Sequence, residues 1–230
     1  MIGLPLLVDG SMFYLIMMNN FFDSASNWSD YGLDNYKSGY WESASGPGSS
    51  NSIASVSVDL IESTIREHNI KSILDLGCGD WNWMKNLKSL FTEVTYEGWD
   101  AGQGVVDLNN KNYSDSNITF KRKDIITEDY PVVDLIVCRD VLFHLPIEEG
   151  SIVVEKIKKS SAKYLISTSF NDVQQNIIEE TNINGISGFN FYRINLLTEP
   201  FSLDNNITRS IAEDVSCKGT KRYICLFNLL

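Results

Sequence analysis

The sequence predicts an α/β fold with a mostly parallel sheet that helices cover on both faces. From residue 72 onwards, short apolar runs typical of buried strands alternate with segments of helical periodicity. The chain ends in two β-like runs, 207–213 and 222–229, separated by a short loop that contains Gly219. This ending indicates a hairpin whose last strand enters the sheet antiparallel.

Individual elements are predicted in order along the chain. Residues 52–68 carry apolar side chains mostly at helical spacing, and the run 72–76 (SILDL) is typical of a strand buried on both faces. Further strands are predicted at 95–99, 118–120, 134–138 and 164–168, and further helices at 81–90 and 147–160.

Length and composition favour one domain preceded by an irregular segment. The chain has 230 residues, 43% of them apolar, which suffices for a sizeable core. The first 22 residues are apolar but lack a basic start and are interrupted by Asp9 and Gly10, so they predict neither a signal peptide nor a membrane span. We divide the chain into an N-terminal lead-in and lid segment, 1–51, and a main domain, 52–230.

Charge and cysteine usage exclude several classes of function. The formal charge of −11 argues against nucleic-acid binding, and we interpret the basic run 121–123 as a solvated strand end. The four cysteines and two histidines show no metal-ligand spacing, so no metal site is expected. Disulfides are not required, which favours a reducing, cytoplasmic location.

The stretch SILDLGCGDW places Asp75, Gly77 and Gly79 at the end of the first predicted strand. Ligands of open α/β sheets bind beyond the carboxyl ends of strands, where glycine permits a sharp turn and a close approach to the backbone. A dinucleotide fingerprint requires a third glycine where Asn82 stands, and Asp80 would repel a phosphate. A nicotinamide oxidoreductase is therefore disfavoured.

Two more acids follow later strands. Asp100 ends the second predicted strand, where an acid can accept hydrogen bonds from two ribose hydroxyls. Asp124, beside Ile125, follows the third strand, where the carboxylate could bind an adenine amino group and the aliphatic side chain could pack on the ring. Alternatively, Asp124 caps a helix. Together the acids predict a pocket for a nucleoside that bears a cation.

These motifs resemble those of the class I S-adenosylmethionine-dependent methyltransferases. The run 75–79 (DLGCG) resembles motif I, Asp100 and Asp124 stand where the family has its ribose and adenine acids, and 133–145 resembles motif IV and its continuation. The resemblance implies a Rossmann-like three-layer sandwich, a seven-stranded sheet with an antiparallel last strand, and S-adenosylmethionine as cofactor. It also implies that Asp75 orients the glycine loop or the cofactor's amino group. The bulky run 80–83 departs from the family pattern.

Other segments extend the predicted site. The glycine- and serine-rich run around Ser45 could close over the cofactor's carboxylate with Trp41 as a lid, although a flexible linker is the alternative. We also assign Arg139 to the cofactor-binding set. His144 lies just beyond the fourth strand and is the candidate general base, with Asp140 to orient it or to touch the acceptor. Alternatively, His144 caps a turn before Pro146.

Aromatic and amide side chains in 169–171 and 188–196 are typical of sugar-ring recognition. Together with the lead-in loop and the run 138–145, these residues resemble methyltransferases associated with glycan gene sets, which implies a small-molecule or glycan acceptor and favours O-methylation of a sugar hydroxyl. N-methylation of an amine or protein side chain and a non-catalytic, cofactor-binding scaffold are the alternatives. A monomer and a homodimer both remain open.

Overall fold

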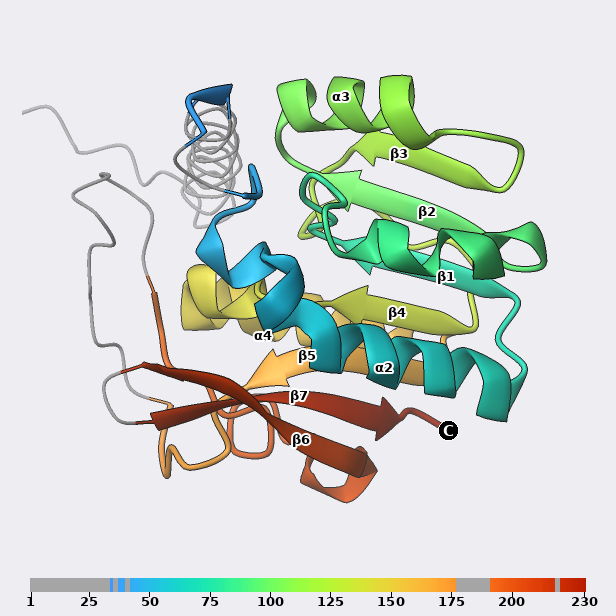
Figure 1. Cartoon of the computed structure of the whole chain (residues 1–230). Helices are drawn as coiled ribbons and strands as arrows, with labels where there is room; N and C mark the ends of the chain where they lie inside the picture. Colours follow the sequence, from blue (N-terminus) through green and yellow to red (C-terminus); the bar gives the residue numbers. More distant parts are fainter. Residues whose placement is uncertain (1–33, 35–36, 40–41, 177–190, 218–219) are drawn as a thin grey trace, which may run out of the picture.

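The computed structural model describes residues 34, 37–39, 42–176, 191–217 and 220–230, with the backbone alone for 214–217. A seven-stranded sheet in the order β3-β2-β1-β4-β5-β7-β6 forms its centre (Figure 1). The strands are β1 (Ser72–Leu76), β2 (Thr95–Asp100), β3 (Ile118–Arg122), β4 (Leu135–Cys138), β5 (Tyr164–Ser169), β6 (Ile207–Cys217) and β7 (Thr220–Asn228). Strands β1 to β5 are parallel, whereas β7 pairs antiparallel with both β5 and β6. The predicted mostly parallel sheet with its antiparallel closing hairpin is confirmed.

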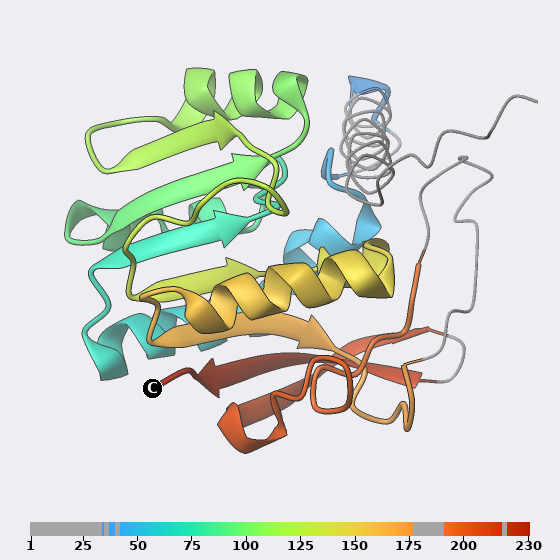
Figure 2. The ribbon, with the colours of Figure 1, turned by 180° about the vertical axis from the view of Figure 1, so that it is seen from behind.

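Helices cover both faces of the sheet. The α-helices are α2 (Asn51–His68), α3 (Gln103–Tyr113) and α4 (Ile147–Lys159), and the 3₁₀ segments are η1 (Pro47–Ser49), η2 (Met84–Thr92), η3 (Leu142–His144) and η4 (Asp204–Asn206). Helix α2 and segment η2 lie on one face, and α4 lies on the other, as the two opposite views show (Figures 1 and 2). The molecule is therefore a three-layer sandwich, as expected.

The apolar strands are explained by burial on both faces. In β1, Ile73 packs in a cluster with Leu60 of α2, while Leu74 belongs to the opposite cluster with Val153 of α4. All three aliphatic residues at the centre of the neighbouring β4, 135–137, are fully buried. A strand that contacts helices on both sides needs apolar residues at consecutive positions, which is the pattern seen in the sequence.

The predicted helix at 81–90 differs from the structure, which has the 3₁₀ segment η2 instead. Trp81 has φ of 59°, a left-handed conformation that cannot belong to a right-handed helix. From Met84 onwards, Leu87 and Phe91 are buried. Met84 and Leu87 are three positions apart, which suits the tighter 3₁₀ geometry, whereas Leu87 and Phe91 are four apart.

Helix α3 was not predicted from the sequence. Its buried positions are only Val105, Val106 and Asn109, and the remainder of the helix is largely polar. The helix packs against β2 and β3 at the edge of the sheet, so a narrow apolar stripe is enough to hold it (Figure 1).

The carboxyl ends of β1 to β5 meet at one edge, here called the carboxyl edge. Segment η1 and the start of α2 lie at the same edge (Figure 1). In the part of the chain that the structure describes, no helix combines the length and the apolar character that crossing a bilayer demands.

Candidate active site

The glycine loop, residues 77–79, leaves β1 through two backbone conformations that favour glycine. Gly77 has φ of 77° and Gly79 has φ of 55°. The amides of Gly77 and Cys78 both donate to the carbonyl of Trp99, at 2.8 and 2.9 Å, which turns the loop back over β2. The predicted sharp turn at the carboxyl edge is therefore present.

Protein side chains approach both glycines closely. A Cβ atom at Gly77 would lie 2.3 Å from Cγ2 of Val141, and one at Gly79 would lie 1.9 Å from Oγ of Ser45. On the side where a Cβ would point, the glycines make room for neighbouring loops of the protein. A ligand could therefore approach the loop closely only from the opposite side, where it would meet the backbone amides.

Substituting Gly79 tests this packing. We expect Gly79→Ala to lower the free energy of unfolding by about 1–3 kcal/mol more than Gly39→Ala, because overpacking adds to the left-handed strain. Gly39 has a similar φ of 77° with no atom within 4 Å of a Cβ, so it isolates the backbone cost. Urea denaturation of the two variants measures the difference, and equal losses would contradict the packing account.

Asp80 fastens the lead-in segment onto the glycine loop. Its carboxylate accepts hydrogen bonds from the Ser43 hydroxyl (2.8 Å), the Ala44 amide (2.7 Å) and the Ser45 hydroxyl (3.2 Å). In return, the Asp80 amide donates to Oγ of Ser45 at 2.8 Å. Sequence reasoning assigned no such role to Asp80, although an acid directly after two glycines was a signal.

These contacts bear on two residues of the predicted cofactor set. The Ser45 hydroxyl donates to Asp80 and accepts from the Asp80 amide, so its main partners belong to the loop. The assignment of Ser45 to the cofactor stays a prediction. Trp41, the predicted lid residue, lies outside the described residues.

Asp100 joins the glycine loop to the next helix. One carboxylate oxygen accepts from the Gly79 amide at 3.0 Å and the other from the Gly102 amide at 2.9 Å, at the start of α3. Burial raises the pKa of Asp100. Each oxygen has a second lone pair, so the carboxylate can still accept two ribose hydroxyls.

Asp75 is buried at the end of β1. The Tyr96 hydroxyl donates to its Oδ2 at 2.6 Å. Burial raises the pKa of Asp75 to about 7, and the nearby charge of Asp100 acts in the same direction. At neutral pH, the protein alone therefore does not compensate fully for the cost of burying the ionised Asp75 carboxylate.

Asp75, Asp80 and Asp100 together form an acid cluster around the glycine loop. Asp100 is electrostatically coupled to both of the others. Among the described residues, none of the three carboxylates forms an ion pair with a lysine or arginine. A cationic ligand at this loop would supply the missing countercharge.

Asp124 closes the turn after β3. Its oxygens accept from the Ile126 amide and the Thr127 hydroxyl, both at 2.9 Å, which agrees with the capping alternative. The neighbouring Ile125 is half-buried and uses its carbonyl to accept from Tyr130 at 2.7 Å. Two acceptor positions of the Asp124 carboxylate are used for the turn, and binding of adenine by Asp124 and Ile125 stays a prediction.

Arg139 and Asp140 belong to a buried four-charge cluster, which also includes Glu213 of β6 and Arg222 of β7. Arg139 pairs with Asp140 at 2.8 Å and with Glu213 at 3.0 Å. Arg222 pairs with Asp140 at 3.0 Å and also with Glu213. The Arg139 guanidinium further donates to Ser57 of α2 (2.8 Å) and to the Gly48 carbonyl (3.1 Å).

This cluster alters the interpretation of Arg139. All its nitrogens donate within the protein, so its guanidinium joins the lead-in segment, α2, β4 and β6. Its guanidinium holds these segments together, and direct binding of a cofactor by Arg139 stays a prediction.

Asp140 is likewise held by the protein. It has φ of 58°, its amide donates to the Thr168 hydroxyl at 2.9 Å, and that hydroxyl donates to Oδ1 at 2.8 Å. Its Oδ2 accepts from Arg139 and Arg222. These bonds engage both oxygens, and the role of Asp140 toward His144 or the acceptor stays a prediction.

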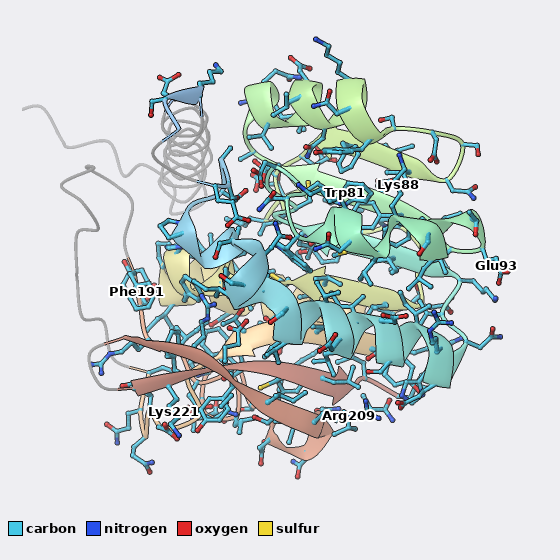
Figure 3. The ribbon with its side chains drawn as sticks, in the orientation of Figure 1. Trp81, Lys88, Glu93, Phe191, Arg209 and Lys221 are labelled. Carbon is cyan, nitrogen blue, oxygen red and sulfur yellow. The ribbon has the colours of Figure 1, made fainter. Side chains whose placement is uncertain are left out.

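His144 lies in η3 among aromatic rings. Its ring centroid is 4.4 Å from that of Phe143 and 6.1 Å from that of Phe191. Phe143, Phe170 and Phe191 pack edge-on or tilted against one another, and Phe191 lies at the carboxyl edge (Figure 3). The structure thus brings the candidate base and an aromatic surface together.

The predicted amide groups of the acceptor wall have structural roles. Asn195 donates to the carbonyls of Asn171 (3.3 Å) and Val173 (2.8 Å), and its own amide donates to Asn176 at 2.7 Å. These bonds join the loop after β5 to the segment before β6. Of the aromatic residues of the wall that the structure describes, Phe170 and Tyr192 are buried and Phe191 is partly exposed, and residues 177–190 lie outside the described residues.

Two further predictions concern basic residues and metals. Lys121 pairs with Glu97 and Lys123 with Glu128, both at 2.7 Å, so the acids beside this run compensate both lysine charges. Within the described ranges, no group of three or more His, Cys, Asp or Glu side chains is arranged to hold a metal ion.

Comparison with known proteins identifies the fold. No protein-family model and no curated protein matches the chain. Magnesium protoporphyrin IX methyltransferase from Synechocystis PCC 6803, crystallised with bound SAM, superposes with a TM-score of 0.62 at 16% identity over 90% of this chain and 95% of that one. N-methyltransferase NodS from Bradyrhizobium japonicum WM9, in complex with S-adenosyl-l-homocysteine (SAH), superposes with a TM-score of 0.56 at 14% identity over 79% of this chain and 89% of that one.

A third similar structure is the N-terminal domain of EvdMO1, crystallised in the presence of SAH and D-fucose. It has a TM-score of 0.56 at 11% identity and covers 78% of this chain and 84% of that one. At such identities the comparisons establish the fold: the chain has the Rossmann-like fold of the class I methyltransferases.

Proposed function

We propose that this chain, which has the class I methyltransferase fold, is an S-adenosylmethionine-dependent methyltransferase. The observation that carries the proposal is the acid cluster of Asp75, Asp80 and Asp100 around the glycine loop, whose carboxylates form no ion pair among the described residues, although the charge of Arg139 acts to lower the pKa of Asp75. The similar structures were crystallised with SAM or SAH. S-adenosylmethionine carries a sulfonium and an ammonium group, so its net positive charge complements this cluster.

The residues present fit such a cofactor. Asp100 retains two acceptor positions for ribose hydroxyls, and Asp124 with Ile125 would receive the adenine. Asp75, the most strongly perturbed of the acids described above, would lie nearest the cationic end. The cofactor supplies a methyl group on positively charged sulfur, so this chain's task is to bind, to orient and to exclude water, and positioning of this kind supplies ~7–11 kcal/mol.

We propose a sugar hydroxyl as the methyl acceptor. The ring of Phe191 is partly exposed near His144, whereas Phe143 is buried, and sugar rings stack on accessible aromatic rings while their hydroxyls bind polar groups. His144 would remove the hydroxyl proton. The fucose present in crystals of the EvdMO1 domain adds support by analogy of fold alone.

A reducing compartment such as the cytoplasm suits this proposal. Cys78, Cys138 and Cys225 are buried free thiols, and burial raises the pKa of each. Such thiols are unreactive core residues.

Replacing His144 tests the catalytic assignment. We expect His144→Gln to lower kcat roughly 10²- to 10⁴-fold while SAH affinity remains unchanged, because a general base contributes to the rate and not to cofactor binding. His68 is the matched control, since it stacks on Tyr164 at 4.3 Å and belongs to the end of α2, away from the carboxyl edge. Radiolabelled methyl transfer to a panel of sugars measures kcat. An unchanged rate in His144→Gln would show that another group removes the proton.

A further inference from the structure

The four-charge cluster leaves one strong donor without a partner. Arg222 is 6% exposed, its Nε donates to Glu213 and its Nη1 donates to Asp140 at 3.0 Å. Its Nη2 is buried and has no hydrogen-bond partner in the part of the chain that the structure describes. A buried donor left unpaired is costly, and more so when the group is charged. Native proteins rarely keep such a group without water, an ion or a ligand to complete it.

Arg222 lies at the carboxyl edge. Its neighbour Tyr223 pairs with Ser169, the last residue of β5, so Arg222 lies just beyond the carboxyl end of that strand. Its ion-pair partner Asp140 follows β4 and precedes His144 by four residues. A ligand atom at Nη2 would therefore lie at the same edge as the glycine loop and the candidate base.

Gly48 packs closely against this ion pair. A Cβ atom at Gly48 would lie 3.2 Å from both Nη1 of Arg222 and Oδ2 of Asp140. Any larger residue in the lead-in segment would press on the pair. The Gly48 carbonyl accepts a hydrogen bond from Arg139 at 3.1 Å, so the cluster also holds this part of the lead-in segment.

The chemistry of the free donor indicates its ligand. Nη2 carries two N–H groups of a planar guanidinium, and the remaining donors of Arg222 already bind carboxylates. A carboxylate is the group that a guanidinium binds most strongly and with the best geometric match. We infer that Nη2 of Arg222 binds a carboxylate of the methyl acceptor, so that the acceptor is an acidic sugar. This inference rests on the proposed function and narrows it to one substrate class.

A matched pair of acceptors tests the inference with wild-type protein. Methyl β-D-glucuronide and methyl β-D-glucoside differ only in carrying a carboxylate or a hydroxymethyl group. We expect kcat/KM for the glucuronide to be roughly 10- to 100-fold higher, which is the value of a hydrogen bond to a charged group. Equal values for the two sugars, or no binding of the glucuronide to SAH-loaded protein in calorimetry, would overturn the inference.

Variants separate the role of Arg222 from folding. Arg222→Gln leaves the Glu213 carboxylate short of a donor, so the double variant Arg222→Gln/Glu213→Gln is made beside it, with exposed Lys221→Gln as the control. SAH-induced thermal shift monitors folding. We expect both Arg222 variants to lose the preference for the glucuronide and Lys221→Gln to keep it. A preference that survives in a folded Arg222 variant would contradict the inference.

The remaining outcomes distinguish this inference from the proposed function. If Arg222 variants lose affinity for SAH but not for 5′-methylthioadenosine, the carboxylate is the cofactor's own and the acceptor assignment is wrong. If the glucoside alone is methylated, the proposed function stands and the acidic acceptor is wrong. If the glucuronide binds in an Arg222-dependent way but is not methylated, the carboxylate site stands and sugar methylation is wrong.

Discussion

Replacing Arg139 by methionine is expected to lower the free energy of unfolding by about 3–5 kcal/mol. This is the usual cost of removing one member of a buried ion pair, because the partner is left as an uncompensated buried charge. Here the Glu213 side chain is fully buried, and Asp140 is only slightly exposed. The substitution would also remove the donors to Ser57 and to the Gly48 carbonyl.

Two controls identify the cause. Arg66 on α2 pairs with Glu62 at 2.8 Å on the exposed surface, so Arg66→Met should cost about 0.5 kcal/mol or less. The double variant Arg139→Met/Glu213→Gln should be less destabilised than the sum of its single variants, because the buried charge is removed as well. Denaturation by urea measures the free energy of unfolding of all four variants. Additive losses would show that the cluster is not energetically coupled.

Replacing Asp75 by asparagine is expected to stabilise the unliganded protein at pH 8 and to weaken cofactor binding. Burial raises the pKa of Asp75 from 3.8 to about 7, so between these values the folded protein holds a proton that the unfolded chain has released. Its contribution to the free energy of unfolding therefore falls as pH rises from about 4 to 7, and it stays low above that. Asparagine does not titrate.

The expected gain of Asp75→Asn at pH 8 is about 1–4 kcal/mol, with no comparable gain near pH 4. Some pH dependence should remain, because burial also raises the pKa of Asp100. S-adenosylmethionine affinity should fall about tenfold or more through loss of the countercharge. Denaturation at both pH values and calorimetry measure the two effects, with exposed Asp59→Asn as the control. An unchanged pH slope would contradict the assignment of Asp75.

The layered fold was predictable because its causes are local in the sequence. Strands β1 and β4 contact helices on both faces, so their residues are buried at consecutive positions and form apolar runs that the sequence shows directly. The hairpin was predictable because two β-like runs flank one short loop. The acids at the ends of β1 and β2 were found because parallel strands bring their carboxyl ends together. Helix α3 was missed because its apolar stripe is narrow.

The four-charge cluster was not predictable from the sequence. Arg139 meets Glu213 across 74 positions, and Arg222 meets Asp140 across 82. No local spacing rule connects such residues, because the connection depends on how the closing hairpin packs beside β5 and α2. The same applies to Ser45 and Gly79, whose contact requires the lead-in segment to return over the glycine loop. Long-range contacts of this kind arise only from the tertiary packing of the chain.

Calorimetric titration of the full chain with S-adenosylmethionine, at pH 6 and at pH 8, tests most directly whether the acid cluster holds a cationic nucleoside. The account predicts binding at a single site, with tighter binding at pH 8, because Asp75 is then ionised and a cation favours its charged form. Folded protein that releases no heat with either S-adenosylmethionine or SAH would contradict it.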